Sequence, residues 1–295
     1  MNENGQTETT PDRILLATDL SARCDRALDR AAQLADEWQA ELIALNVLDP
    51  AVSPDQALAW ACGADEEDLL RVARQQLRRD LAGLSIRATM RTAREGDAAE
   101  IIRDVAAEIG AGLVVTGMAR DETLGRFLLG SIVERLARML SQPLLVVHTR
   151  PRAPYRRIVV ATDFSESSRH ALQAAARLFP ERELILYHAY EIPLSTRPDE
   201  ARADRIRRDI EQGECADFVT ASELPAQTRV RPAIEHGSVA ASLTRYVREH
   251  DIDVVVAGTR GRSAVVGVLL GSTAATLLEW LPCDTLLVRQ PRPTM

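Results

Sequence analysis

The chain contains one pattern twice, and this internal repeat limits the possible folds more than any other feature of its 295 residues. The segment Ile14-Leu15-Leu16-Ala17-Thr18-Asp19 returns 144 residues later as Ile158-Val159-Val160-Ala161-Thr162-Asp163. Gly117, followed by Gly130-Ser131, returns 141 residues later as Gly258, followed by Gly271-Ser272. Because the spacing changes so little over a whole copy, we predict two homologous domains of about 140 residues each, a usual domain size.

The repeat places the expected domains at residues 13–149 and 157–290. Residues 1–12 are polar and lack an apolar core region, so we expect a disordered N-terminus without a secretory signal. The connection at residues 149–154 is short and contains two prolines, which predicts domains that are packed together rather than loosely strung.

Each copy alternates short apolar strands with helical stretches. In the second copy Ala171, Ala174, Ala175 and Leu178 recur at helical spacing and form one apolar stripe. Longer helices are expected at 200–221 and 239–249. Strands separated by helices imply right-handed crossovers and a parallel sheet covered on both faces, so we predict an α/β fold with two tandem doubly wound domains of five strands each. The expected strands are 14–18, 42–47, 86–90, 113–116, 144–148, 158–162, 184–187, 228–233, 253–257 and 285–288.

The segment after the fourth strand of the second copy has the features of an anion site. A buried, β-branched run, 253–257, enters Gly258-Thr259-Arg260-Gly261, and after nine more residues Gly271-Ser272-Thr273 begins a helix. Glycine allows the backbone to approach a ligand closely, and the first N–H groups of a helix attract negative charge. All 36 basic residues are arginine, which excludes a P-loop lysine, a kinase-type lysine and Schiff-base chemistry. Amides, hydroxyls and arginine would have to hold a phosphate here.

This Gly-x-x-Gly, nine-residue, Gly-Ser/Thr spacing resembles the nucleotide loop of the universal stress protein family, and the repeat resembles its tandem type. The resemblance covers nearly the whole chain. It implies the strand order 3-2-1-4-5 of an adenine nucleotide alpha hydrolase-like fold, and ATP, ADP or AMP as the ligand, with Mg²⁺ as a possible companion. It also implies nucleoside contacts at Ala161, Thr162 and Asp163, adenine near Ala189, and phosphates around Gly258, Arg260, Gly261, Gly271, Ser272 and Thr273. An ionised Asp163 only accepts hydrogen bonds, which suits ribose hydroxyls and not phosphate.

Each of these residues also has a purely structural interpretation. Asp163 precedes a helix and could cap it, Gly258 and Gly261 could serve turns, and Ser272 could cap the following helix. His188, at the end of the second strand of its copy, is expected to be structural rather than a catalytic base. The order in which the loop residues occur still favours the nucleotide site over independent structural roles.

The first copy departs from the loop pattern, because Gly117-Met118-Ala119-Arg120 carries arginine in place of the second glycine. A side chain at a position of positive φ costs about 1–2 kcal/mol, and the guanidinium would occupy phosphate space. Arg120 would pair with Asp19 or bind a smaller anion itself. Gly130-Ser131 remains, but Ser131 to Glu134 also forms a capping box. We therefore predict that the second domain binds a nucleotide and that the first binds it poorly or not at all.

The composition of the chain argues against several kinds of binding partner. The net charge of −7 and the pI near 5.4 argue against nonspecific nucleic-acid binding. No apolar run is long enough to span a bilayer, so no membrane partner is expected and we expect a cytoplasmic protein. The four cysteines and five histidines show neither metal-ligand spacing nor close pairing, so neither a protein metal site nor a disulfide framework is expected.

The leading function is that of a stress protein in which a bound adenine nucleotide regulates conformation or the choice of a protein partner. Slow ATP hydrolysis, or autophosphorylation at Ser263, Ser272 or Thr273, is the enzymatic alternative. Asp163 is the one obvious candidate to position the nucleophile or a magnesium ion, and the resemblance assigns it to the nucleoside instead. The third possibility is a nucleotide-independent scaffold for a protein partner. The last strands, 144–148 and 285–288, are expected to join the copies in an internal pseudo-dimer, and further homo-oligomerisation is left open.

Overall fold

The computed structural model describes residues 10–21, 24–48, 61–63, 65–84, 86–93, 97–118, 122–123, 126–127, 131–192, 200–260 and 271–290. The chain divides into two compact units, which we call the N-terminal unit (Pro11–Pro154) and the C-terminal unit (Tyr155–Met295). Residues 1–9, most of the segment for which disorder is expected, lie outside the described residues.

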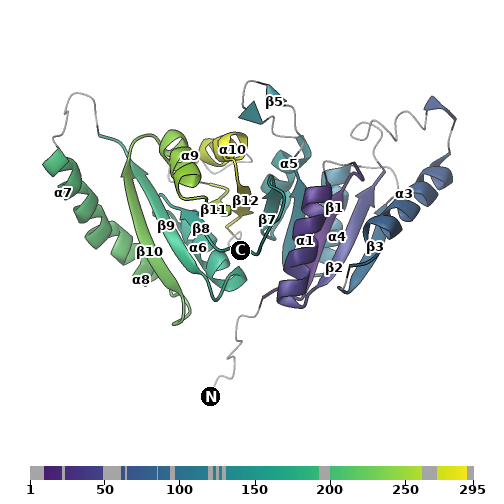
Figure 1. The fold of residues 1–295 in the computed structure, drawn as a ribbon, viewed down its shortest axis with the longest axis horizontal. Helices are drawn as coiled ribbons and strands as arrows, with labels where there is room; N and C mark the ends of the chain where they lie inside the picture. The colour runs from purple at the N-terminus through teal and green to yellow at the C-terminus, as the bar shows by residue number, and fades with distance from the viewer. Residues whose placement is uncertain are drawn as a thin grey trace, which may run out of the picture. The chain divides into compact units, whose positions relative to one another are not determined.

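The N-terminal unit is built on a parallel sheet whose described strands lie in the order β3-β2-β1-β4-β7 (Figure 1). Right-handed crossovers place the helices that follow β1 and β2 on one face of the sheet, and those that follow β3 and β4 on the other. The strands are β1 (Arg13–Thr18), β2 (Glu41–Val47), β3 (Ala88–Ala93), β4 (Leu113–Gly117) and β7 (Leu144–Val147), and the helices are α1 (Asp25–Trp38), α3 (Glu66–Asp80), α4 (Ala98–Glu108) and α5 (Ser131–Met139).

The C-terminal unit repeats this arrangement with the order β10-β9-β8-β11-β12. Counted along the chain, both sheets have the order 3-2-1-4-5, and the predicted fold class is confirmed. The strands are β8 (Ile158–Ala161), β9 (Glu183–Tyr190), β10 (Arg229–His236), β11 (Val254–Gly258) and β12 (Asp284–Val288), and the helices are α6 (Glu166–Leu178), α7 (Glu200–Ile210), α8 (Ala216–Ala221), α9 (Val239–Glu249) and α10 (Ser272–Trp280).

Both sheets are buried because their central strands are continuous runs of aliphatic residues. Leu113, Val114 and Val115 of β4 and Val254, Val255 and Val256 of β11 are at most 1 % exposed, as expected where helices cover both faces of a sheet. The edge strand β10 contains Pro232, which lacks the N–H that a second neighbour would need. Among the described residues, no helix is long and apolar enough to cross a bilayer.

Several local features differ from the sequence prediction. The helix expected at 200–221 is broken into α7 and α8 by a five-residue π-helical segment, Glu211–Cys215, inside which Gly213 has non-helical angles (φ −98°, ψ −105°). Charged residues continue at helical spacing through this segment, so the pattern gave no sign of the break. β3 begins and ends later than the expected 86–90, because its register with β2 runs from Ala88 to Ala93.

In the N-terminal unit the interval between β4 and α5 contains a short antiparallel ribbon of β5 (Glu122–Thr123) and β6 (Arg126–Phe127). This interval corresponds to the loop predicted to hold phosphate in the second copy. The ribbon is an addition to the five-stranded plan that the repeat predicted.

Candidate functional site

The residues predicted to contact a nucleoside come from neighbouring strands of the C-terminal unit. β8 pairs with β11 in parallel, and the register sets Ala161 opposite Ala257. Thr162 and Asp163 therefore follow β8 at the edge of the sheet where Gly258 ends β11. Ala189 lies near the end of β9, the other neighbour of β8. The topology thus brings the ends of three strands to one edge, which is where open parallel sheets bind ligands.

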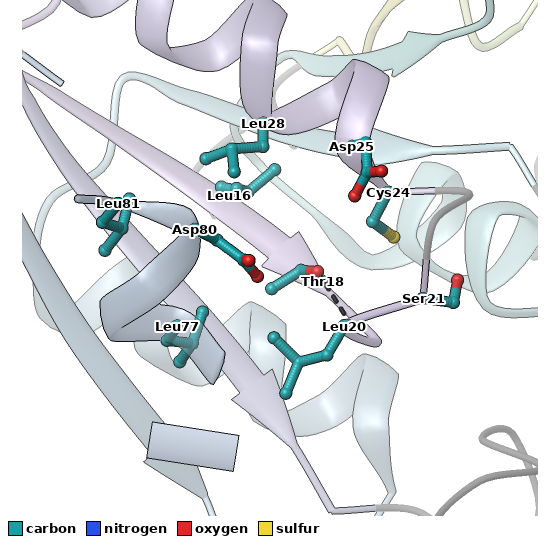
Figure 2. A pocket seen from close by; sticks show the side chains of 10 residues that line it. All are labelled: Leu16, Thr18, Leu20, Ser21, Cys24, Asp25, Leu28, Leu77, Asp80 and Leu81. Carbon is teal, nitrogen blue, oxygen red and sulfur yellow. Dashed lines mark hydrogen bonds between the residues drawn. The ribbon is translucent and has the colours of Figure 1, made fainter. Parts of the chain in front are cut away.

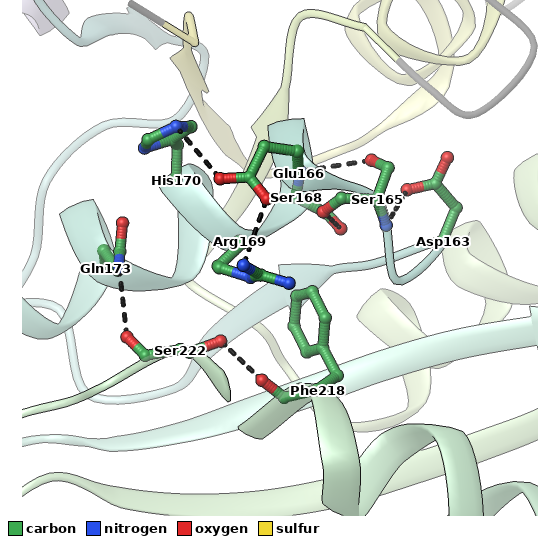
Figure 3. A network of polar contacts seen from close by, with 9 residues as sticks. All are labelled: Asp163, Ser165, Glu166, Ser168, Arg169, His170, Gln173, Phe218 and Ser222. Atoms are coloured by element: carbon green, nitrogen blue, oxygen red, sulfur yellow. Dashed lines mark hydrogen bonds and ion pairs between the residues drawn. The ribbon is translucent and has the colours of Figure 1, made fainter. Parts of the chain in front are cut away.

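The turn between β8 and α6 is fixed by short-range hydrogen bonds (Figure 3). Asp163 Oδ1 accepts a hydrogen bond from the backbone N–H of Ser165 at 3.1 Å. Ser165 itself is the N-cap of α6, since its Oγ accepts from the N–H of Ser168 at 3.3 Å. The helix cap therefore belongs to Ser165, and Asp163, a half-buried residue, shapes the turn that precedes it.

Phe164, in the same turn, has the left-handed backbone angle φ +60°, which is uncommon for a residue with a side chain. Its N–H donates to Thr162 Oγ1 at 2.9 Å, and its ring stacks on His188 with centroids 4.4 Å apart. Leu20 has φ +62° at the same place in the first copy, and its N–H donates to Thr18 Oγ1 at 3.0 Å. Both copies thus make the same turn after the first strand.

His188 has a structural role that the first copy makes visible. Its Nδ1 lies 2.9 Å from the carbonyl oxygen of Thr162, and because a carbonyl only accepts, Nδ1 carries the hydrogen. In the N-terminal unit, Asn46 Nδ2 donates to the carbonyl of Thr18 at 2.9 Å. The two side chains perform the same task, which is to hold the strand end that leads to the aspartate.

Gly258 is required by packing between α6 and β11. A Cβ atom at this position would lie 2.5 Å from Ser167 Oγ and 2.8 Å from the carbonyl oxygen of Ser167. These separations are too short for any real contact, and the φ angle of Gly258 is not positive. The glycine therefore allows the close approach of α6 rather than a special turn.

Past Gly258, backbone hydrogen bonds close the two ends of the loop into a neck. The N–H of Thr259 donates to the carbonyl of Val288 at 3.0 Å, and the N–H of Gly271 donates to the carbonyl of Thr259 at 2.9 Å. The N–H of Arg260 donates to Ser167 Oγ at 3.3 Å. These three amides are thus engaged by the protein and hold the beginning of α10 beside the end of β11.

α10 begins without a side-chain cap. Gly271 is its N-cap residue and offers no side-chain acceptor, and the first turn contains no acidic residue. Within the part of the chain that the structure describes, no side chain thus neutralises the N–H groups and the positive dipole end of this helix. Thr273 in the first turn is exposed. Gly261 and the Ser272 side chain lie outside the described residues, so their predicted contacts stay predictions.

The corresponding turn in the N-terminal unit has a different set of hydrogen bonds around its aspartate. Asp19 Oδ1 accepts from the N–H of Ser21 at 2.9 Å, from Ser21 Oγ at 2.7 Å and from Cys24 Sγ at 3.1 Å. Burial, reinforced by the negative charge of Asp19, raises the pKa of the Cys24 thiol to about 12, so this thiol stays protonated and continues to donate. One oxygen of Asp19 thus has three internal donors.

A cavity beside the carboxyl end of β1 is nearly filled by side chains from α1 and α3 (Figure 2). Its volume is about 10 Å³, which is room for about one water molecule. Asp25 and Asp80 reach its rim, and burial together with the charge of Asp25 raises the pKa of Asp80. A cavity of this size has no space for a nucleoside.

Other predicted residues of the first copy are only partly described. Gly117 ends β4, Ser131 begins α5, and Arg120 and Gly130 lie outside the described residues. Glu134, the expected second member of a capping box, forms an ion pair with Arg138 one turn later in the helix. Among the described residues, no group of three or more histidine, cysteine and acidic side chains could hold a metal ion.

Comparisons with known proteins agree with this architecture. The model of the universal stress protein family matches the chain twice, at residues 11–148 and 154–289. A universal stress protein of Mycolicibacterium smegmatis is 26% identical over 299 residues, which cover 94% of this chain and 96% of that protein.

Solved structures show the same fold at low sequence identity. A Pseudomonas aeruginosa PAO1 protein described as functionally unknown is 20% identical with a TM-score of 0.66, covering 97% of this chain and 95% of that one. A universal stress protein from Archaeoglobus fulgidus DSM 4304 is 19% identical with a TM-score of 0.65, covering 95% and 99%. The two family matches and the repeated sheet order lead to one conclusion: the chain belongs to the universal stress protein family and contains two of its domains in tandem.

Proposed function

We propose that the C-terminal unit binds an adenine nucleotide as a regulatory ligand in a stress response. The observation that carries the proposal is the uncapped start of α10, which the neck between Thr259 and Gly271 holds at the same sheet edge as Asp163. Hydrogen-bond donors for the phosphates and a carboxylate for the ribose at the same sheet edge suit a nucleotide.

The hydrogen bonds of the neck limit which groups of the loop can donate to a phosphate. The backbone amides of Arg260 and Gly271 already have acceptors in the protein, so these two amides support the loop and leave phosphate binding to other donor groups. The first amides of α10, at Ser272 and Thr273, together with Gly261, are the proposed phosphate donors. The Arg260 guanidinium is a further donor, and Ala161, Thr162, Asp163 and Ala189 would contact the nucleoside.

We propose no comparable affinity for the N-terminal unit. Three internal donors surround one oxygen of Asp19, and the glycine of the loop pattern is replaced by Arg120. The protein should therefore bind one equivalent of nucleotide per chain.

Isothermal titration calorimetry of the full chain with ATP, ADP and AMP, each with and without Mg²⁺, tests the proposal. The expected result is one site per chain in the wild type and no detectable binding in Gly261→Arg. Gln75→Arg, which adds the same charge at an exposed position of α3, is the matched control and should bind like the wild type. ATP at 100 times its dissociation constant should stabilise the wild type by about 2.7 kcal/mol.

Unchanged affinity in Gly261→Arg would refute the assignment of the loop, and absence of binding in the wild type would favour a nucleotide-independent scaffold. Asp163→Asn keeps an oxygen that can accept from Ser165 but removes the charge, and it should weaken ATP binding. Phosphate release by the wild type above the level of the Gly261→Arg variant would show hydrolysis at this site and would assign an enzymatic role.

A further inference from the structure

A separate cavity of ≈330 Å³ lies at the other edge of the C-terminal sheet. Arg157 precedes β8, Glu183 begins β9, Arg231 is the third residue of β10, and His250 follows α9, and all four line the cavity. Because these strands are parallel, their first residues mark the amino edge of the sheet, opposite the edge where Gly258 ends β11. The cavity shares no residue with the proposed nucleotide site.

The lining of this cavity carries more positive than negative charge. Arg156, Arg157 and Arg231 contribute three guanidinium groups, whereas Glu183 is the one carboxylate among the lining residues that the structure describes. Arg157 has a structural task, since it donates to the carbonyl of His250 at the end of α9 at 3.0 Å and pairs with Asp251 at 3.3 Å. The two other guanidinium groups of the lining are those of Arg156 and Arg231.

Neither of these two arginines is strongly neutralised. No described residue forms a hydrogen bond or ion pair with the side chain of Arg156. Arg231 forms an ion pair of 3.7 Å with Glu183 in which both side chains are about half exposed, and it makes a long 3.4 Å bond to the Tyr246 hydroxyl. Their guanidinium groups can thus turn to a ligand without breaking a strong internal bond.

The nearby acidic side chains outside the lining are directed elsewhere. Asp253 Oδ2 accepts from the backbone N–H groups of Arg156 and Arg157 at 2.8 and 2.9 Å. The Asp251 side chain is 82% exposed and pairs with Arg157. Glu249 is exposed at the end of α9. None of these three carboxylates is among the residues that line the cavity.

The floor of the cavity is apolar. Ile185 and Ile252 line it and are 6% and 5% exposed. His250 stacks on Tyr246 with ring centroids 4.0 Å apart, and its Nδ1 donates to the Tyr246 carbonyl at 3.1 Å, which leaves Nε2 for a ligand. The volume is at the small end of the range for ligand pockets. Such a site suits a small molecule that has both an apolar part and an anionic group.

We infer that this cavity binds a small organic phosphate. Arg156, which precedes β8, and Arg231 of β10 donate to the phosphate oxygens, and the carbon skeleton lies over Ile185 and Ile252. Phosphate fits better than carboxylate, because its three terminal oxygens can accept from several donors that approach from different directions. The site adds a second ligand to the protein and does not depend on nucleotide binding at the carboxyl edge.

Calorimetry with phenyl phosphate on the full chain at low ionic strength tests the inference, since salt screens such a partly exposed site. The wild type should show saturable binding, and the double variant Arg156→Gln/Arg231→Gln should bind at least about tenfold more weakly, because two charge-assisted hydrogen bonds are lost. The matched control is Arg103→Gln/Arg207→Gln, which removes the same charge from exposed helical ion pairs with Asp104 and Asp204. The control should bind like the wild type.

Two further measurements distinguish binding at this cavity from binding at the nucleotide site and from nonspecific attraction between charges. Gly261→Arg should retain phenyl phosphate binding, and Arg156→Gln/Arg231→Gln should retain ATP binding if the wild type binds ATP. Inorganic phosphate should bind more weakly than phenyl phosphate, because it cannot use the apolar floor. No saturable binding by the wild type, an equal loss in the control pair, or loss of phenyl phosphate binding in Gly261→Arg would overturn the inference.

Discussion

Replacing His188 by alanine should destabilise the C-terminal unit by about 2 kcal/mol. The variant loses the hydrogen bond from Nδ1 to the Thr162 carbonyl, a bond of 2.9 Å that contributes about 1 kcal/mol. It also loses the stacking of the imidazole on Phe164, with centroids 4.4 Å apart, which contributes about 0.5–1.5 kcal/mol. His188→Asn is the matched variant, because Asn46 makes the equivalent hydrogen bond in the N-terminal unit. It should recover about half of the loss.

Urea unfolding followed by Trp280 fluorescence measures these changes. Trp38 and Trp60 are replaced by Phe in every variant, so that the signal comes from α10 of the C-terminal unit. The expected order of stability is wild type, His188→Asn, His188→Ala. Equal losses in the two variants would show that the hydrogen bond contributes nothing, and the proposed equivalence of His188 and Asn46 would be refuted.

Three other substitutions test the packing and the charges described above. Gly258→Ala should cost about 1–3 kcal/mol in urea unfolding, and adding Ser167→Ala should recover only part of it, since the Ser167 carbonyl remains 2.8 Å from the new Cβ. Tyr155→Phe should cost about 1.5–3 kcal/mol, because it removes the buried 2.6 Å hydrogen bond to Asp284; a wild-type free energy of unfolding would contradict this. Burial raises the pKa of Cys24 from 9.0 to about 12, so its contribution to stability is complete below pH 9 and is lost towards pH 12. Wild type should lose more stability than Cys24→Ala over that interval, and parallel pH profiles would refute this.

The sequence predicted the fold well because the repeat and the strand pattern constrain each other. Two copies of one strand–helix alternation leave the doubly wound sheet as the simple solution, and the family resemblance supplied the order 3-2-1-4-5 that both units show. The break in the helix at 200–221 was missed. Gly213 lies at the break, but one glycine is tolerated in many helices, so its presence did not predict the change.

The site was predictable at the level of topology and not at the level of contacts. Asp163 and Gly258 follow the first and fourth strands, which the predicted order makes neighbours, so their common edge could be foreseen. The contact between Gly258 and Ser167 could not be foreseen, because these two residues are far apart in the sequence. The contact also depends on how closely α6 approaches β11. The shared role of His188 and Asn46 required the register of the strands, since the side chains differ in chemistry.

The hydrogen bond between Thr259 and Gly271 has a consequence for how a duplicated protein of this kind can evolve. It joins the end of β11 directly to the start of α10, so backbone atoms of the described residues fix the spacing of these two elements. Substitutions in the sequence between them can therefore accumulate in one copy of a duplicated domain while its sheet and helices keep their places. After a gene duplication, one domain can therefore keep a ligand-binding loop and the other can lose it, while both domains still fold.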